Sequence, residues 1–365
     1  MRIEITRSIR EQHVAAYGGA LNRALEALSE GCHVPWRHSH SIGVSDADLK
    51  ECDVRHLFDT LRKQQGKVNG LLIGCVESLL GAMKRIEPIR KIVRNRSSAS
   101  AQRCDDQMRQ LFCYEKFVGN EHLAYMEKED AIEYRSGEWG SRAFLRQLGV
   151  RACPYCNAEP IHISDSNQAN DTVNSLDHYF DKAKFPYLAL SLYNMIPVCR
   201  PCNEERRRKL DKMSAEKYAH PYRESMHHQL AFTVKIKNWR CVRGIGMPDD
   251  AELELRQQQG VQRSVQALAL LHGMGIDSLY RQDYFDETLK TLGIIGKMRK
   301  ERKLVLTNKF PGIQEAKAYR QYFMQDLSED KINVTRFSKL KLDLIREMKP
   351  LLGEREKRSH WKTRC

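Results

Sequence analysis

Four cysteines in two closely spaced pairs are the residues of this chain best suited to hold a metal ion. Cys153 and Cys156 enclose Pro-Tyr, and Cys199 and Cys202 enclose Arg-Pro, so both pairs have the spacing Cys-x-x-Cys. Two such pairs can give four thiolates to one tetrahedral Zn²⁺. A structural Zn²⁺ contributes on the order of 10 kcal/mol to folding. We therefore expect zinc to replace an apolar core in this loop-rich stretch.

An Asp-His pair and two asparagines lie within or beside the stretch that the cysteines enclose. These residues are Asp177, His178, Asn194 and Asn203. An imidazole titrates near neutrality, so His178 can serve as a general base toward water. On an extended strand Asp177 points to the opposite side. Its carboxylate and the Asn203 side-chain carbonyl suit Mg²⁺, which prefers oxygen ligands. The set matches the needs of metal-assisted phosphodiester hydrolysis.

The stretch resembles the HNH endonuclease family, whose ββα-metal fold cuts phosphodiester bonds. Asp177 looks like the metal-binding Asp of that family and His178 like its general base. Asn194 looks like the central Asn that fixes the loop and the histidine, and Asn203 like the final metal ligand. The resemblance covers roughly Arg151 to Glu224. It implies cleavage of DNA with Mg²⁺ or Mn²⁺, leaving a 5′ phosphate and a 3′ hydroxyl.

The run Lys-Phe-Pro-Tyr-Leu-Ala-Leu-Ser-Leu-Tyr-Asn at residues 184–194 is close to HNH proteins of bacterial anti-phage systems. Those include the nuclease partner of the ATPase in Septu and in related retron-associated systems. The resemblance implies an effector nuclease in anti-phage defence, with an ABC-type regulatory ATPase as its partner and room for a homo-oligomer. The chain departs from the family at Asp181, where proline is usual, and at Glu204 and Glu205, where small or basic residues are commoner.

The charge of the chain favours a polyanionic partner. Lys and Arg number 61 against 47 Asp and Glu, a formal net charge of +14. Such an excess promotes binding to phosphates by counterion release. The residues expected to contact phosphates beside the cut are Lys182, Arg206, Arg207, Arg208 and Lys209. The alternative for the last four is a solvated basic helix end.

Other interpretations of the same residues remain open. Cys-Pro-Tyr-Cys is also the redox motif of glutaredoxins, but there it begins a helix that follows a strand, whereas here a helix is expected before it. The Asp-His pair and the asparagines could form structural hydrogen bonds or helix caps in a catalytically silent zinc module that only binds nucleic acid. A nuclease for structured RNA is the third alternative to a DNA nuclease.

The remaining cysteines and histidines give weaker patterns. A cluster around Pro35-Trp36 contains Cys32, His33, His38 and His40, but its spacing matches no zinc pattern. Other histidines are expected to lie at the surface or in packing, although His220 could approach the site. Isolated cysteines are expected to be small buried residues, namely Cys52, Cys75, Cys104, Cys113 and Cys241.

Hydrophobic periodicity predicts a mostly helical α+β protein in three parts. Residues 1–150 are expected to form a helical N-terminal region, residues 151–224 the zinc-bound ββα-metal nuclease domain, and residues 225–365 a helical C-terminal region with a basic tail. Further basic clusters lie at 84–96 and 297–303.

Several element boundaries can be predicted as well. One helix should end near Gly31, another should begin after an N-cap at Ser45, and the apolar run Leu71 to Ile86 should form a core helix. A short strand is expected at 232–236, and the segment from Asp250 to Leu271 is expected to be helical.

The chain gives no sign of export or membrane insertion. Its eleven cysteines are an odd number, and its first residues lack the apolar run of a secretory leader. No window approaches the ~18 apolar residues that a membrane span requires. We therefore expect a cytoplasmic protein with reduced thiols and no membrane partner.

Overall fold

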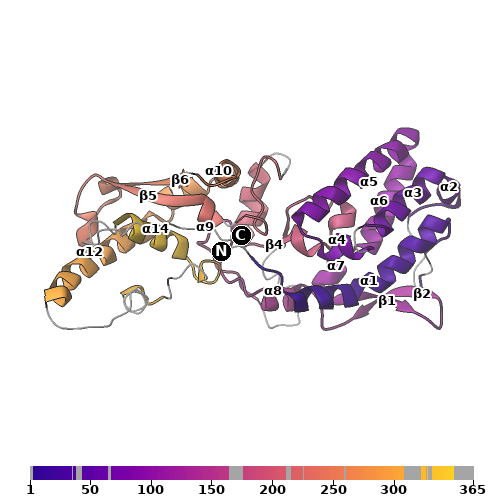
Figure 1. Cartoon of the computed structure of the whole chain (residues 1–365), viewed down its shortest axis with the longest axis horizontal. Helices are drawn as coiled ribbons and strands as arrows, with labels where there is room; N and C mark the ends of the chain where they lie inside the picture. Colours follow the sequence, from indigo (N-terminus) through magenta and orange to yellow (C-terminus); the bar gives the residue numbers. More distant parts are fainter. Residues whose placement is uncertain are drawn as a thin grey trace.

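The protein is elongated, with two lobes at opposite ends, one formed by N-terminal residues and the other by C-terminal residues (Figure 1). The computed structural model describes residues 3–34, 36–37, 43–64, 67–163, 176–210, 215–224, 226–258, 260–307, 322–325, 327 and 331–348. Within these ranges, helices are combined with two-stranded antiparallel sheets, which confirms the α+β class. None of the described helices has the length and apolar character needed to cross a membrane.

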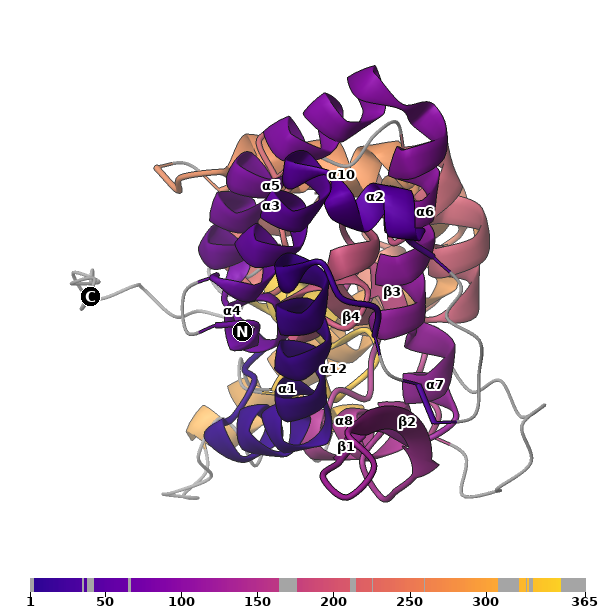
Figure 2. The ribbon, with the colours of Figure 1, turned by 90° about the vertical axis from the view of Figure 1, so that its right-hand side faces the viewer.

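The N-terminal lobe is built from helices that pack around α1, and Figure 2 looks onto this lobe. Gly31 ends α1 in a left-handed conformation with φ 85°, and Ser45 begins α2 with a capping box, so both predicted boundaries are confirmed. The helices are α1 (Arg7–Glu30), α2 (Asp46–Lys50), α3 (Cys52–Arg62), α4 (Asn69–Ile73), α5 (Val76–Arg96), α6 (Ser98–Leu111), α7 (Tyr114–Val118) and α8 (Ser141–Leu148).

One hairpin that was not expected interrupts the helices of the N-terminal region. Strands β1 (Glu121–Met126) and β2 (Ala131–Ser136) pair antiparallel. Asp130, in the turn between them, takes a positive φ of 48°, which suits a tight reversal and not a helix. The Tyr17 hydroxyl of α1 donates to the carbonyl of Glu121 at 2.7 Å and attaches the hairpin to the helices.

The predicted core helix at 71–86 is divided in two. Helix α4 ends at Ile73 and α5 begins at Val76. At Gly74 a side chain would collide with the backbone carbonyl of Gly70, so the chain turns where only glycine fits. Helix α5 then continues through Pro88 to Arg96.

The central stretch contains two short antiparallel strands followed by a helical segment. Strand β3 (Leu176–His178) pairs with β4 (Met195–Pro197), and residues 200–209 are helical. The loop between the strands contains two 3-10 turns, Pro186–Leu188 and Leu192–Asn194. The order strand, loop, strand, helix brings both cysteine pairs and the Asp-His pair into one small unit.

The C-terminal lobe combines a hairpin with helices. The predicted strand at 232–236 is confirmed as part of β5 (Leu230–Ile236), but its partner β6 (Ala251–Gln257) occupies residues expected to be helical. Its buried residues recur at every second position, a strand period that the helical interpretation overlooked. The helices are α9 (Met226–Gln229), α10 (Ser264–Gly273), α11 (Ile276–Gln282), α12 (Phe285–Thr307) and α14 (Ser338–Met348).

The isolated cysteines divide into two groups. Cys104 and Cys241 are buried as expected, whereas Cys113 is only partly buried and Cys52 and Cys75 are exposed, so the prediction is wrong for these three. Both exposed residues lie at helix starts, where the chain enters from solvent.

One histidine and one arginine of the clusters noted in the N-terminal region pair with acidic side chains. His33 pairs with Asp46 at 2.6 Å, while His38 and His40 lie outside the described residues. Arg90 of the first basic cluster is buried between Glu87 and Asp105, so it is not part of a solvated or phosphate-tracking face. The basic tail and the side chains of residues 299–303 also lie outside the described part.

Candidate metal centre and active site

The sulfurs of Cys153, Cys156, Cys199 and Cys202 form one buried cluster. All four Sγ atoms lie within 4.8 Å of one another, and those of Cys156 and Cys199 are 3.8 Å apart. A tetrahedral Zn²⁺ with sulfurs at about 2.3 Å needs sulfur–sulfur distances of about 3.8 Å, whereas a disulfide bond is about 2.05 Å long. The cluster therefore fits a metal such as zinc and is not a disulfide.

Tight backbone turns shape both pairs. The Asn157 N–H donates to the carbonyl of Cys153 at 2.7 Å, and Asn157 itself takes a left-handed φ of 52°. The Asn203 N–H donates to the carbonyl of Cys199 at 3.1 Å. Hydrogen bonds from the other three sulfurs hold the pKa of the Cys156 thiol well below its usual range, whereas burial raises the pKa of Cys153 and hydrogen bonds with the other sulfurs raise that of Cys202.

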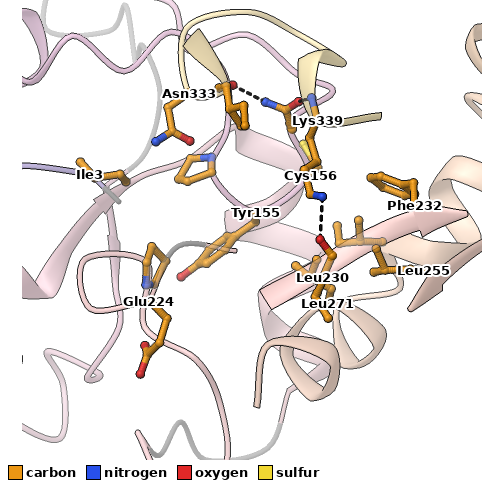
Figure 3. A pocket seen from close by; sticks show the side chains of 15 residues that line it. Ile3, Tyr155, Cys156, Glu224, Leu230, Phe232, Leu255, Leu271, Asn333 and Lys339 are labelled. Atoms are coloured by element: carbon orange, nitrogen blue, oxygen red, sulfur yellow. Dashed lines mark hydrogen bonds between the residues drawn. The ribbon is translucent and has the colours of Figure 1, made fainter. Parts of the chain in front are cut away.

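The C-terminal lobe packs against the first cysteine pair. The Tyr280 hydroxyl donates to the carbonyl of Cys156 at 2.7 Å. Figure 3 shows the mainly apolar pocket at this junction, with Tyr155 and Cys156 on one side and Phe232 and Leu255 of the β5–β6 hairpin on the other. The backbone around the cluster is thus supported from outside the central stretch.

Asn157 extends this support to the end of the described chain. Its Nδ2 donates to the carbonyl of Ile332 at 2.6 Å, and its Oδ1 accepts from the backbone N–H of Lys339 at 3.0 Å. The Lys339 ammonium in turn donates to the carbonyl of Leu230 at 2.6 Å (Figure 3). One asparagine side chain therefore joins the first cysteine turn to the segment that leads into α14.

Asp177 lies in β3 with 5% of its surface exposed. Its Oδ2 accepts hydrogen bonds from the Tyr155 hydroxyl at 2.8 Å and from Nε of Arg207 at 3.3 Å. Among the described residues, Oδ1 has no partner. The carboxylate links the first cysteine pair to the helical segment after the second pair, and one of its oxygens remains available to a cation.

His178 is held by a carbonyl of the loop between the strands. Its Nε2 lies 2.9 Å from the oxygen of Ala189. A carbonyl oxygen only accepts, so Nε2 carries the proton and Nδ1 is the basic nitrogen. Within the described part of the chain, Nδ1 has no hydrogen-bond partner. Burial lowers the pKa of His178 below its ordinary value of 6.5, which keeps the imidazole neutral at pH 7.

Asn194 is fully buried and ties together the loop that carries Ala189. Its Oδ1 accepts from the N–H of Phe180 at 2.6 Å, and its Nδ2 donates to the carbonyls of Phe180 and Leu188 at 3.0 Å. The Asn194 side chain therefore holds Phe180, two residues after His178, close to Leu188, which precedes Ala189.

Asn203 lies half-buried in the π-helical turn Cys202–Arg206. Its carboxamide makes no hydrogen bond to any described residue, so its oxygen is available as a ligand. Arg207, in the next turn, points back to the strand and donates from Nη2 to the carbonyl of Tyr179 at 3.2 Å. The guanidinium that pairs with Asp177 thus comes from the same helical segment as Asn203.

The predicted basic row on this segment points in several directions. Arg207 faces Asp177, whereas Nη1 of Arg206 lies 3.5 Å from the carbonyl of Gly275, with the Lys209 ammonium near the same glycine. Arg208 is exposed and has no ion-pair partner among the described residues. Arg208 and Lys209 are the exposed members of the row.

A cavity of about 200 Å³ has two residues that contact His178 in its wall, although His178 itself does not line it. Tyr114, which meets the imidazole edge-on with ring centroids 4.6 Å apart, forms part of its wall, as does Ala189. Lys182 also lines the cavity, where its ammonium lies 2.5 Å from Glu115 and 4.4 Å from the Tyr114 ring. The N-terminal lobe therefore supplies one wall of this cavity.

His220 approaches this unit as a packing residue. It is fully buried, with its ring 4.1 Å from that of Tyr179, and it accepts from the N–H of Tyr222 at 3.2 Å. Burial lowers the pKa of His220 to about 3. The expectation of a packing role is confirmed. His162 and His228 are exposed, as expected for surface residues.

Sequence reasoning missed three contacts of the Asp-His pair. Tyr155 lies inside the first cysteine pair, and a hydroxyl between two ligands could have indicated a partner for Asp177. The inward direction of Arg207 is hidden by its basic neighbours. The contact of Tyr114 with His178 spans 64 positions, counted as 178 − 114, and no local pattern signals it.

Comparison of the chain with protein-family models, curated proteins and solved structures finds no match. The functional assignment below therefore depends on the residues and their geometry.

Proposed function

We propose that the chain is a metal-dependent endonuclease of the HNH type that hydrolyses phosphodiester bonds of DNA. The main support is the hydrogen bond between His178 and Ala189, because it leaves Nδ1 as the basic nitrogen of the residue that follows Asp177 in β3. The order of two antiparallel strands and a helical segment around four clustered cysteines supports the same proposal. Zinc in this cluster would have a structural role.

The proposed reaction assigns one task to each side chain. A Mg²⁺ or Mn²⁺ ion between Asp177 and Asn203 would supply Lewis-acid stabilisation of the phosphate. His178 accepts a proton from water at Nδ1, while its Nε2–H remains bonded to the Ala189 carbonyl and keeps the ring oriented. The water oxygen forms a bond to phosphorus, the bond from phosphorus to the 3′ oxygen breaks with its electron pair on that oxygen, and the 3′ oxygen takes a proton from solvent water to give the 3′ hydroxyl. Arg207 orients the Asp177 carboxylate.

The exposed cations beside this centre suit the substrate backbone. Arg208 and Lys209 extend the helical segment into solvent, and Lys182 lines the cavity whose wall contacts His178. Phosphate contacts of this kind set the register of a nucleic acid without reading its sequence. We propose that these residues hold the phosphates that flank the cut, with Arg206 and Arg207 in supporting positions.

A nucleic-acid adaptor without catalytic activity is the second candidate. The pairing of Asp177 with Arg207 favours it, because a guanidinium already balances the carboxylate charge. A nuclease for structured RNA would use the same site, and cleavage assays with DNA and with RNA distinguish the two substrates.

Cleavage of plasmid DNA and of structured RNA with Mg²⁺ tests the proposal. We expect His178→Ala to lower the cleavage rate about 10²- to 10⁴-fold, the usual contribution of a general base. His162→Ala, which changes an exposed histidine of the same stretch, should cleave like the wild type. Equal rates for wild type and His178→Ala would exclude His178 as the base. Binding by the wild type without cleavage would favour the adaptor.

The biological setting proposed here is anti-phage defence in the bacterial cytoplasm, with an ABC-type ATPase as regulatory partner. The resemblance of residues 184–194 to the nucleases of such systems supports this. Isolation of the native protein with its bound partners tests it, since a co-purifying ATPase is the expected result. Purification with no ATPase under gentle conditions would contradict the assignment.

A further inference from the structure

A buried histidine of the N-terminal lobe contacts the loop that holds His178. His13 of α1 has none of its surface exposed. Its Nε2 lies 2.7 Å from the carbonyl oxygen of Leu190, and the indole N–H of Trp139 donates to its Nδ1 at 3.0 Å. Both ring nitrogens of His13 are therefore engaged.

The partners of His13 determine its tautomer. An indole N–H can only donate, so Nδ1 of His13 is unprotonated. A carbonyl oxygen can only accept, so Nε2 carries the proton and donates to Leu190. Trp139 thus donates to His13, and His13 donates to Leu190 in the loop. A rotation of the His13 ring would break both hydrogen bonds.

Leu190 directly follows Ala189, whose carbonyl accepts from His178. Two consecutive loop carbonyls thus bind two histidines, one from the N-terminal lobe and one from β3. The next residue, Ser191, donates its hydroxyl to the carbonyl of Leu71 in α4. Because neighbouring peptide planes share a Cα atom, fixing the Leu190 carbonyl restricts the orientation of the Ala189 carbonyl.

We propose that His13 and Trp139 are positioning residues for the base. They hold the loop so that the Ala189 carbonyl accepts from Nε2 of His178 and Nδ1 remains the basic nitrogen. This inference depends on the proposed function for its catalytic consequence, whereas its structural part concerns the tautomer of His178 alone.

Two substitutions of His13 separate positioning from simple packing. His13→Leu fills similar space but removes both hydrogen bonds. His13→Gln can retain both, because its amide oxygen accepts from Trp139 and its amide nitrogen donates to Leu190. Trp139→Phe keeps an aromatic ring and removes only the donor. Leu25→Ala changes a fully buried residue farther along the same helix and serves as the control for lost stability.

The first measurement is the ¹⁵N chemical shifts of the His178 ring, which report the protonated nitrogen. We expect the wild type, His13→Gln and Leu25→Ala to show the Nε2–H tautomer. His13→Leu and Trp139→Phe should show a mixture of tautomers. A pure Nε2–H tautomer in folded His13→Leu and in Trp139→Phe would overturn the proposal.

The second measurement is the DNA cleavage rate with Mg²⁺ at saturating substrate. We expect His13→Leu to lower it about 100-fold, as a misplaced catalytic group does, and His13→Gln to retain most of it. Leu25→Ala should lower the melting temperature without this loss of rate. If the wild type cleaves nothing, the proposed function fails, and the tautomer measurement still decides the positioning role. A rate loss in Leu25→Ala equal to that in His13→Leu would show that stability alone is responsible.

Discussion

The hydroxyl of Tyr155 donates to Oδ2 of Asp177 at 2.8 Å, so a residue inside the first cysteine pair contacts the strand that carries the Asp-His pair. Both side chains are buried. We predict that Tyr155→Phe lowers the free energy of unfolding by about 1.5–3 kcal/mol, as expected for a lost hydrogen bond to a charged group. Chemical denaturation measures this change. An equal stability of wild type and Tyr155→Phe would contradict the prediction.

Metal removal should unfold more than the cysteine turns. We expect one zinc ion per chain by metal analysis, and a large loss of thermal stability with a strong chelator, since structural zinc contributes on the order of 10 kcal/mol. Because Tyr280 and Asn157 connect the first cysteine turn to the C-terminal lobe, hydrogen exchange should increase in residues 332–339 as well. Cys52→Ser is the control, since Cys52 is exposed and outside the cluster. Folded protein without bound metal would contradict the prediction.

Arg207 and a divalent cation should compete for the charge of Asp177. We predict that Arg207→Gln lowers the free energy of unfolding by about 3–5 kcal/mol without divalent ions, because a buried carboxylate loses its ion-pair partner. Millimolar Mg²⁺ should then raise the melting temperature of Arg207→Gln more than that of the wild type. Arg208→Gln, one position along and exposed, should respond like the wild type. Identical Mg²⁺ responses of wild type and Arg207→Gln would argue against a cation at Asp177.

Acid should destabilise the protein through His13. Burial lowers its pKa from 6.5 to about 4 in the folded state, so the unfolded chain takes up a proton first as the pH falls. The contribution of His13 to the free energy of unfolding is about 3 kcal/mol. It is fully present above pH 6.5 and is lost as the pH falls from about 6.5 to about 4. Chemical denaturation at pH 7 and at pH 4 should show a smaller loss in His13→Gln than in the wild type by about this amount. Equal losses would show that His13 does not have this lowered pKa.

The cysteine cluster could be predicted from the sequence because its information is local. Each Cys-x-x-Cys pair sets the spacing of two metal ligands within four residues, and the structure brings all four sulfurs together. The neighbouring positions of Asp177 and His178 on a strand followed equally from a short pattern.

Contacts between distant residues could not be predicted in this way. The pairing of β6 with β5 was missed because residues 251–257 were expected to be helical, although their apolar residues alternate with polar ones as in a strand. The contacts of His13 with Leu190 and of Tyr114 with His178 join residues that no spacing rule connects. Such contacts depend on how the lobes pack, which is a property of the whole chain.

The bonds of Asn157 to Ile332 and Lys339 have a consequence for synthesis of the protein. The first cysteine turn leaves the ribosome almost two hundred residues before the segment that secures it, counted as about 339 − 157. A nascent chain therefore lacks this support until about 180 residues beyond the first cysteine turn have been made, so the cysteine cluster gains its full set of contacts only late after its own residues emerge.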